Sequence, residues 1–417
     1  MLLDLEWLVI QTYARTSKSL QREGEIFCLD GLFRELSLDL ALNNYRPGQY
    51  RCFVVRDPKI REIFAPTFRD RLVHHLIVER LMPFLDRRLI FDSFANRPQK
   101  GVQKAVRRLQ SIMRRLPPTA YFMKLDIASY FTSINRSKLK KIICWHLHQI
   151  TEICPAEKLF LIDTISRILD QDPAQDPFFS GDKKLLCLVP PHKSLFENPP
   201  SIGMPIGALT SQFFSNIYLN ELDHFVKHRL KAPFYIRYVD DFILLDPDSS
   251  RLYQWKQEIE KFLKSNLDLS LHPHKTLIQP IHRGCDFLGS VVRPHVITIR
   301  PRIISALRSR LIFFNHLLDP KGFPHGKPPA QSTWERHLRL GTLRSPLRPT
   351  VGLLQRFVQT INSYYGVMIH GNTYQLRRQI YLHDFHHLKK YMIPEDSFKK
   401  IRLRPIGLME KEGIIAL

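Results

Sequence analysis

The sequence lacks three features that would assign it to a common class. Its six cysteines include no Cys-x-x-Cys pair, so a disulfide framework is not indicated and a reducing compartment is expected. No apolar stretch reaches the roughly 18 residues needed to span a bilayer. The N-terminus lacks the basic segment of a signal peptide. We therefore expect a cytoplasmic protein that does not associate with membranes.

A zinc site is not indicated either. Cys144, His146 and His148, with Cys154 beyond them, alternate with apolar residues along an expected helix. Ligands at this spacing do not converge on one point, so ordinary packing is the preferred interpretation.

Acidic residues are scarce relative to basic ones. The 417 residues include 62 Lys and Arg against 39 Asp and Glu, a formal net charge of +23. Such an excess favours a polyanionic partner, above all nucleic acid, because phosphate neutralisation with counterion release drives binding. A basic surface without such a role, or a binder of anionic membranes, is the alternative. Hydrophobic residues make up 44% of the chain, ample for a core and for two or three domains.

The pattern of apolar residues predicts an α+β protein whose C-terminal third is helical. Helices are expected over 29–45, 68–89 and 211–230, the last capped by Thr210 or Ser211, and again in two segments after residue 300. Strands are expected over 52–55, 60–64 and 121–125, followed by a hairpin over 235–245. The stretches 171–203 and 320–349 are rich in proline and are predicted to be loops.

Three aspartates have the arrangement that nucleotidyl transfer needs. Asp126 ends an expected strand, and Asp240 and Asp241 stand in the turn of an expected hairpin. Acids at such positions can meet and hold two divalent ions about 3.5–4 Å apart. Taken singly, each is more often a turn former or a helix cap.

The residues around these acids resemble the reverse transcriptase family. Lys124-Leu-Asp126-Ile-Ala-Ser-Tyr-Phe131 resembles the first palm motif of that family. Tyr235-Ile-Arg-Tyr-Val-Asp-Asp-Phe-Ile-Leu resembles its catalytic hairpin, and the run from Gly203 to Gln212 resembles the loop-and-helix motif between the two. All three occur in the order that the family shows.

The resemblance extends from about residue 40 to 295 and implies further roles. Lys59, Arg61 and Arg69 match positions that hold the incoming triphosphate, although a solvated basic hairpin is the alternative for isolated cations. Lys275 matches a lysine that acts as general acid toward the leaving pyrophosphate. The turn Phe287-Leu288-Gly289 matches the primer grip, or else is simply a buried apolar turn.

Finer positions concern the nascent base pair. Phe131 matches the bulky ring that blocks a ribose 2′-hydroxyl, with a core aromatic as the alternative. Ile206, followed by Gly207, stands where many members of the family have a glutamine that touches the nascent pair. An aliphatic side chain cannot form that hydrogen bond, which is expected to loosen discrimination. Gln212 is implied to contact the primer or template.

The resemblance implies a right-hand polymerase with palm, fingers and thumb. We expect an N-terminal region and fingers over 1–120, an antiparallel palm sheet with flanking helices over 121–295, with an inserted fingers or loop segment near 140–203, and a basic helical thumb over 296–417. The cofactors implied are two Mg²⁺ ions, with Mn²⁺ as a substitute, held by Asp126, Asp240, Asp241 and the backbone carbonyl of Ile127.

The partners implied are dNTPs, a template RNA and the RNA/DNA hybrid. Basic side chains near one helix of the thumb are expected to follow the duplex backbone without reading bases, so binding should depend strongly on salt. These are Arg300, Arg302, Arg308 and Arg310. No RNase H or endonuclease motif is apparent.

The details are most similar to the reverse transcriptases of diversity-generating retroelements. The run Pro205-Ile206-Gly207-Ala208-Leu-Thr-Ser-Gln212 resembles their second palm motif, although Ala208 replaces the usual Asn. That branch copies its template with errors at adenines, and a small basic accessory protein assists it. The alternatives are a retron, group II intron-type or phage-defence reverse transcriptase and, more remotely, a catalytically silent RNA-binding scaffold.

Overall fold

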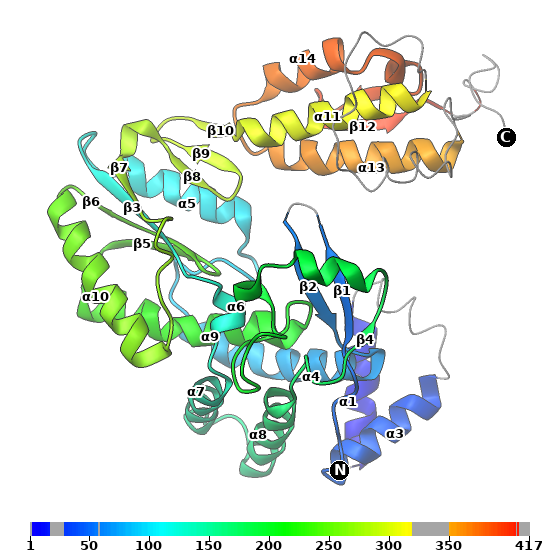
Figure 1. Ribbon diagram of the computed structural model, residues 1–417, viewed down its shortest axis with the longest axis vertical. Helices are drawn as coiled ribbons and strands as arrows, with labels where there is room; N and C mark the ends of the chain where they lie inside the picture. The colour runs from blue at the N-terminus through cyan, green and yellow to red at the C-terminus, as the bar shows by residue number, and fades with distance from the viewer. Residues whose placement is uncertain (1, 17–28, 57–58, 319–349, 406, 408–417) are drawn as a thin grey trace. The chain divides into compact units, whose positions relative to one another are not determined.

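The computed structural model describes residues 2–16, 29–56, 59–318, 350–405 and 407 (Figure 1). The chain divides into two compact units, the first made of residues 1–105 and 120–279 and the second of residues 106–119 and 280–417. Within the described ranges, no helix is both long enough and apolar enough to cross a membrane.

The first unit contains most of the helices of the described chain. They are α1 (Leu2–Arg15), α3 (Leu29–Ala41), α4 (Phe68–Leu85), α6 (Tyr130–Ser133), α7 (Arg136–His148), α8 (Pro155–Asp170), α9 (Leu209–His224) and α10 (Ser249–Leu267), while α5 (Val102–Arg114) is divided between the units. Short 3₁₀ segments are η1 (Asp86–Arg88), η2 (Lys183–Leu188) and η3 (Pro191–Lys193), and a π-helical turn, η4 (Phe225–Arg229), continues α9.

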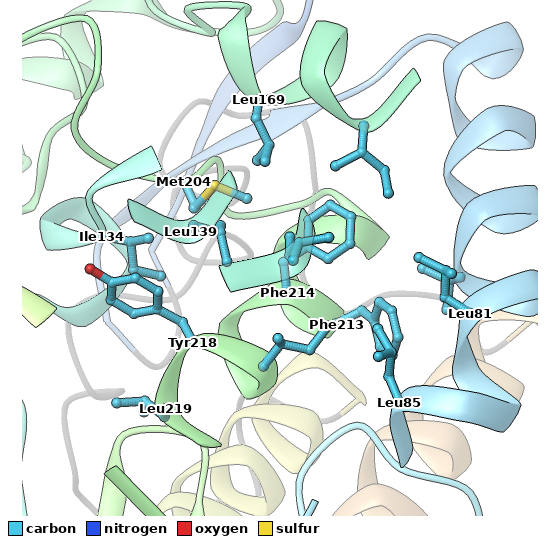
Figure 2. Close-up of a cluster of buried hydrophobic side chains, with 14 of the residues drawn as sticks. Leu81, Leu85, Ile134, Leu139, Leu169, Met204, Phe213, Phe214, Tyr218 and Leu219 are labelled. Carbon is cyan, nitrogen blue, oxygen red and sulfur yellow. The ribbon is translucent and has the colours of Figure 1, made fainter. Parts of the chain in front are cut away.

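Helix α9 lies in the centre of this unit. Its side chains are buried on nearly every side, as expected of a helix that is enclosed by other elements. Figure 2 shows aromatic and aliphatic side chains of α9, among them Phe213, Phe214 and Tyr218, clustered with leucines of α4, α7 and α8. Some buried polar groups of α9 are also engaged; for example, Asn216 donates a hydrogen bond to the carbonyl of Ala95 at 2.7 Å.

The predicted start of α9 is wrong in one detail. The helix begins at Leu209, and its cap is Ala208, which forms no side-chain capping hydrogen bond. Thr210, an expected cap, is buried, and its hydroxyl lies 3.2 Å from Nδ1 of His74. The hydroxyl of Thr210 therefore contacts His74 of α4 and does not cap α9.

A four-stranded sheet in the order β5-β6-β3-β7 forms the palm. Its strands are β3 (Tyr121–Asp126), β5 (Phe234–Tyr238), β6 (Asp241–Asp246) and β7 (Leu277–Pro280). Strand β6 pairs antiparallel with both β3 and β5. The middle of β6 is fully buried, which fits a strand covered on both faces.

A second, smaller sheet carries the fingers hairpin. β1 (Arg51–Val55) and β2 (Arg61–Ala65) pair antiparallel, and β4 (Phe178–Phe179) of the predicted 171–203 loop pairs parallel with β1. Residues 57–58, between these two strands, lie outside the described residues.

The second unit has its own core. Its elements are β8 (Cys285–Phe287), β9 (Ser290–Val292), β10 (Ile297–Ile299), α11 (Pro301–Leu318), α13 (Val351–Met368), α14 (Tyr374–Asp384), β11 (Met392–Glu395) and β12 (Lys400–Leu403), with short 3₁₀ segments η5 (Ile281–Arg283) and η6 (His386–Lys390). Phe314 and Phe357 stack in this core with ring centroids 4.0 Å apart. The antiparallel hairpin β11–β12 is absent from the helical pattern predicted for this region, and the predicted 320–349 loop lies outside the described residues.

Candidate active site

The palm sheet brings the three predicted aspartates to one end of neighbouring strands. The antiparallel register of β3 and β6 pairs Asp126 directly with Asp241, and Tyr238 of β5 pairs with Asp241 from the other side. Asp240 stands in the turn between β5 and β6. Val239 precedes it with φ +55°, a left-handed conformation that β-branched residues rarely adopt. The hairpin therefore has a strained turn where its acids are presented.

The electrostatics at Asp240 reflect this crowding of acids. Burial, followed by the negative charges of Asp126 and Asp241, raises the pKa of Asp240 to about 6, whereas a backbone hydrogen bond and Lys275 oppose the rise. Without a cation, the site therefore disfavours ionisation of its central carboxyl.

Two lysines lie beside the other two acids. Lys275 Nζ lies 2.5 Å from Oδ2 of Asp126, and Lys124 Nζ lies 3.0 Å from Oδ2 of Asp241. Among the described residues, no group of three or more His, Cys, Asp or Glu side chains is arranged so that it could hold a metal ion. The carboxylate set has the hard oxygen donors that Mg²⁺ prefers.

Backbone contacts bring Lys275 to the site. Leu271 forms an isolated antiparallel bridge with Ile127, and the N–H of His272 donates to the carbonyl of Asp126 at 2.8 Å. These contacts fix the chain three residues before Lys275 against the end of β3. They also hold the backbone at Ile127, whose carbonyl is a predicted metal ligand.

The fingers hairpin contributes cations near the same acids. The pKa of Lys59 is lowered by burial and by the positive charges of Lys275, Lys193 and Arg61, while Asp126 raises it. Lys59 is thus within electrostatic reach of both a metal-site acid and Lys275. Arg61 is exposed at the start of β2.

Two other residues with predicted substrate contacts, Arg69 and Gln212, differ in their surroundings. Arg69 forms an ion pair with Asp39, and its guanidinium lies over the ring of Tyr45 at 5.2 Å from the centroid. Its assignment to the triphosphate stays a prediction. Gln212 is exposed on the first turn of α9, and its contact with primer or template also stays a prediction.

Hydrogen bonds connect the predicted sugar gate to the loop before α9. The N–H of Met204 donates to the carbonyl of Phe131 at 2.7 Å, and the N–H of Phe64 donates to the carbonyl of Ile206 at 2.8 Å. Gly207 has φ +126°, and a Cβ there would lie 2.8 Å from the carbonyl oxygen of Phe64. Only glycine fits this position. The loop before α9 is therefore held close to β2, and its hydrogen bond with Phe131 holds it to the predicted sugar gate as well.

The predicted primer grip forms a two-residue turn in the second unit. Leu288 and Gly289 both have positive φ, +49° and +88°, as a tight hairpin between β8 and β9 requires. Phe287 is fully buried, as the alternative of a buried apolar turn requires. The N–H of Arg300 donates to the carbonyl of Gly289, and Arg302 is exposed on α11. Their contacts with primer and template stay predictions.

A buried network behind the β5–β6 hairpin was not predicted from the sequence. Arg237 and Asp223 form an ion pair in which both side chains are 0% exposed. The guanidinium also donates to the carbonyl of Val239 at 3.0 Å and to Oδ1 of Asn216 at 3.2 Å, while the hydroxyl of Tyr235 donates to Asp223 at 2.7 Å. The network joins α9 to the strained turn before Asp240. An arginine inside an otherwise apolar strand is the one sequence signal that could have indicated it.

The fold and this site define a class of protein. Residues 56–292 match the family described as reverse transcriptase (RNA-dependent DNA polymerase). This match covers more than half of the chain, so the chain belongs to the reverse transcriptase family, whose members are nucleotidyltransferases.

Individual relatives are distant. The chain is 22% identical over 290 residues to Protein YkfC of Escherichia coli K12, covering 60% of this chain and 68% of that protein. It is 22% identical over 331 residues to the group II intron-encoded protein LtrA of Lactococcus lactis, covering 63% of this chain and 50% of LtrA. Among solved structures, telomerase from Candida albicans with a fragment of telomeric RNA superposes with a TM-score of 0.42 at 12% identity, covering 82% of this chain and 60% of that one. The chain thus spans about half of LtrA and three-fifths of this telomerase chain.

Proposed function

We propose that the chain synthesises DNA on an RNA template, with Asp126, Asp240 and Asp241 as the carboxylates that hold two Mg²⁺ ions. The observation that carries the proposal is the strand register that pairs Asp126 with Asp241 beside the turn holding Asp240. The backbone carbonyl of Ile127 is an additional proposed ligand, and Mn²⁺ is a proposed substitute. When bound, the ions would lower the pKa of the primer 3′-hydroxyl and stabilise the leaving pyrophosphate.

The side chains around the acids would bind and orient the substrates. Lys59 and Arg61 provide positive charge for the triphosphate, Arg through a bidentate fork. Phe131 limits the space beside the sugar. Lys275 carries protons at Nζ and would donate one to the leaving pyrophosphate.

Primer extension tests this function. The purified chain should elongate a primer on an RNA template when dNTPs and Mg²⁺ are present, and chelation of the metal should stop elongation. A chain that binds the primer–template but extends it under no condition, with Mn²⁺ included, would support the silent-scaffold alternative.

The sugar gate predicts how the enzyme discriminates between dNTPs and rNTPs. Replacing Phe131 with valine should relax discrimination against ribonucleotides by about 10- to 200-fold, because the space for a 2′-hydroxyl opens. The ratio of kcat/KM for dCTP and CTP measures it. Phe131→Tyr is the matched control and should retain the wild-type ratio. An unchanged ratio in the valine variant would show that Phe131 only fills the core.

We further propose that the enzyme belongs to a diversity-generating retroelement, in which it copies a template RNA with errors at adenines. The loop before α9, with Ile206 and Gly207, supports this branch. A small basic accessory protein is a proposed partner. The group II intron-encoded relative LtrA supports the alternative of an intron-type enzyme. A repeated template and variable sequence beside the gene would favour the retroelement, and a retron RNA or a defence cassette would exclude it.

The same loop predicts the error spectrum. Replacing Ile206 with glutamine should lower misincorporation opposite template adenine by about 3- to 10-fold, the value of one added hydrogen bond at the nascent pair. Sequencing of cDNA made on a defined RNA measures the change. Ile206→Leu preserves the aliphatic character and should leave the spectrum as in the wild type. An unaltered spectrum in the glutamine variant would contradict the proposed role of Ile206.

A further inference from the structure

The 171–203 segment, which has no role in the function proposed so far, is attached to the fingers hairpin by buried contacts. Glu62 of β2 is only 3% exposed, and its carboxylate accepts hydrogen bonds from the hydroxyl of Ser194, at 2.9 Å, and from the N–H of Leu195. Leu195 is buried in a small cluster with Cys52 and Phe64 of the same hairpin. The chain is therefore fixed to β2 immediately after Lys193.

A second set of contacts connects Thr132 to the segment on both sides of Lys193. The hydroxyl of Thr132, which lies 2.9 Å from the carbonyl oxygen of Ser129, also lies 3.2 Å from the carbonyl oxygen of His192. The side chain of Asn198 donates to the carbonyl of Thr132 at 2.6 Å. Thr132 follows directly on Phe131, so this anchor lies next to the proposed sugar gate.

The loop before α9 completes the attachment. Gly203 has φ +97°, and a Cβ there would collide with the side chain of Leu195. The N–H of Gly203 donates to the carbonyl of Ile134 at 2.8 Å. The close approach of backbone to Leu195 thus depends on glycine, and it fixes the path of the chain around Lys193.

These anchors place Lys193 between two parts of the proposed nucleotide site. Glu62 is the neighbour of Arg61, and Thr132 is the neighbour of Phe131. The Lys193 side chain is exposed, and no carboxylate of the described residues forms an ion pair with it. Its charge reaches Lys59, whose pKa is lowered by burial and then by Lys275, Lys193 and Arg61. Lys275, Lys193 and Arg61 thus all act on Lys59, and this concentration of positive charge favours a ligand with several negative charges.

We propose that Lys193 binds the triphosphate of the incoming nucleotide, together with Lys59 and Arg61. This inference rests on the proposed polymerase function and extends it by a residue of the 171–203 segment. The nucleotide is favoured over the nucleic-acid backbone because both anchors of Lys193 lie beside residues of the nucleotide site, Arg61 and Phe131.

Steady-state kinetics of Lys193→Gln on a fixed RNA template and primer test the proposal. The KM for dNTP should rise about 5- to 10-fold with kcat within about twofold, as expected for loss of one charge-assisted contact at a partly solvated site. The inhibition constant of pyrophosphate should rise in parallel. The affinity for primer–template and its salt dependence should stay as in the wild type.

Two companion variants make the result specific. Lys184→Gln removes the same charge from an exposed position of the same segment and should leave the KM unchanged. Lys193→Arg keeps the charge and should restore most of the nucleotide affinity. A KM for dNTP in Lys193→Gln equal to that of the wild type, with or without weaker primer–template binding, would overturn the inference while leaving the polymerase function intact. A wild-type chain that extends no primer would instead contradict the proposed function itself.

Discussion

Replacing Asp240 with asparagine should lower the rate of single-nucleotide incorporation by at least about 10³-fold. The proposed metal ligand would lose its charge, and several kcal/mol of charge stabilisation in the transition state would go with it. Rapid-quench measurement with saturating Mg²⁺ and dNTP isolates this step from substrate binding.

The same variant should make the metal-free protein more stable at neutral pH. The pKa of Asp240 is raised from 3.8 to about 6 in the folded chain, so the folded state binds a proton more tightly than the unfolded state. Above pH 6 the carboxyl is ionised in both states, and the folded state bears the full cost of that charge. Below about pH 4 it is protonated in both, and the cost disappears. Asp240→Asn should therefore raise the free energy of unfolding by about 1–3 kcal/mol above pH 6 and by little below pH 4.

Chemical denaturation in EDTA at several pH values measures this gain. Asp246→Asn is the matched control, because Asp246 lies on the same strand, β6, but at its other end. That variant should retain incorporation. An Asp240→Asn protein that keeps its activity, or that loses stability at pH 7, would contradict the assignment of the metal site.

Removing the buried arginine should have the largest effect on stability. Arg237→Met leaves Asp223 as an uncompensated charge in a site that is 0% exposed, and loss of one partner of a buried pair typically costs about 3–5 kcal/mol. Lys261→Met serves as the control: it breaks an ion pair with Glu258 in which the two side chains are 73% and 50% exposed, and should cost less than about 1 kcal/mol. Denaturant unfolding of both variants measures the difference.

A double variant separates stability from positioning. Arg237→Met combined with Asp223→Leu removes both charges and should recover part of the stability lost in the single variant. It should still incorporate nucleotides more slowly, because the carbonyl of Val239 loses its donor and the strained turn before Asp240 loses its support. Full activity in a folded double variant would show that the network serves stability alone.

The local parts of the fold were predictable from sequence. The pattern of apolar residues along the chain predicted the strand that ends at Asp126 and the hairpin that presents Asp240. The α+β class with a right-hand polymerase fold is confirmed. What brings the acids together is the pairing of β3 with β6, a contact between distant segments. Local patterns do not contain that register, and only the resemblance to a family implied it.

The supporting residues could not be predicted because their roles depend on burial. Arg237 and Asp223 have the composition of an ordinary surface ion pair, and only the packing of α9 against the sheet shows that both are enclosed. Lys193 lies in a proline-rich stretch that reads as a loop, and its path depends on Glu62, 132 residues before Ser194. The hairpin β11–β12 consists of strands of four residues, too short for a period to be recognised.

The most direct test of the central claim is primer extension on an RNA template with dNTPs and Mg²⁺ by the wild type and by Asp240→Asn side by side. DNA product from the wild type alone is the result that this account predicts, because it requires both RNA-templated synthesis and a catalytic role for Asp240. Equal amounts of product from the two proteins would contradict it, since the acids paired by β3 and β6 would then not be the site of catalysis.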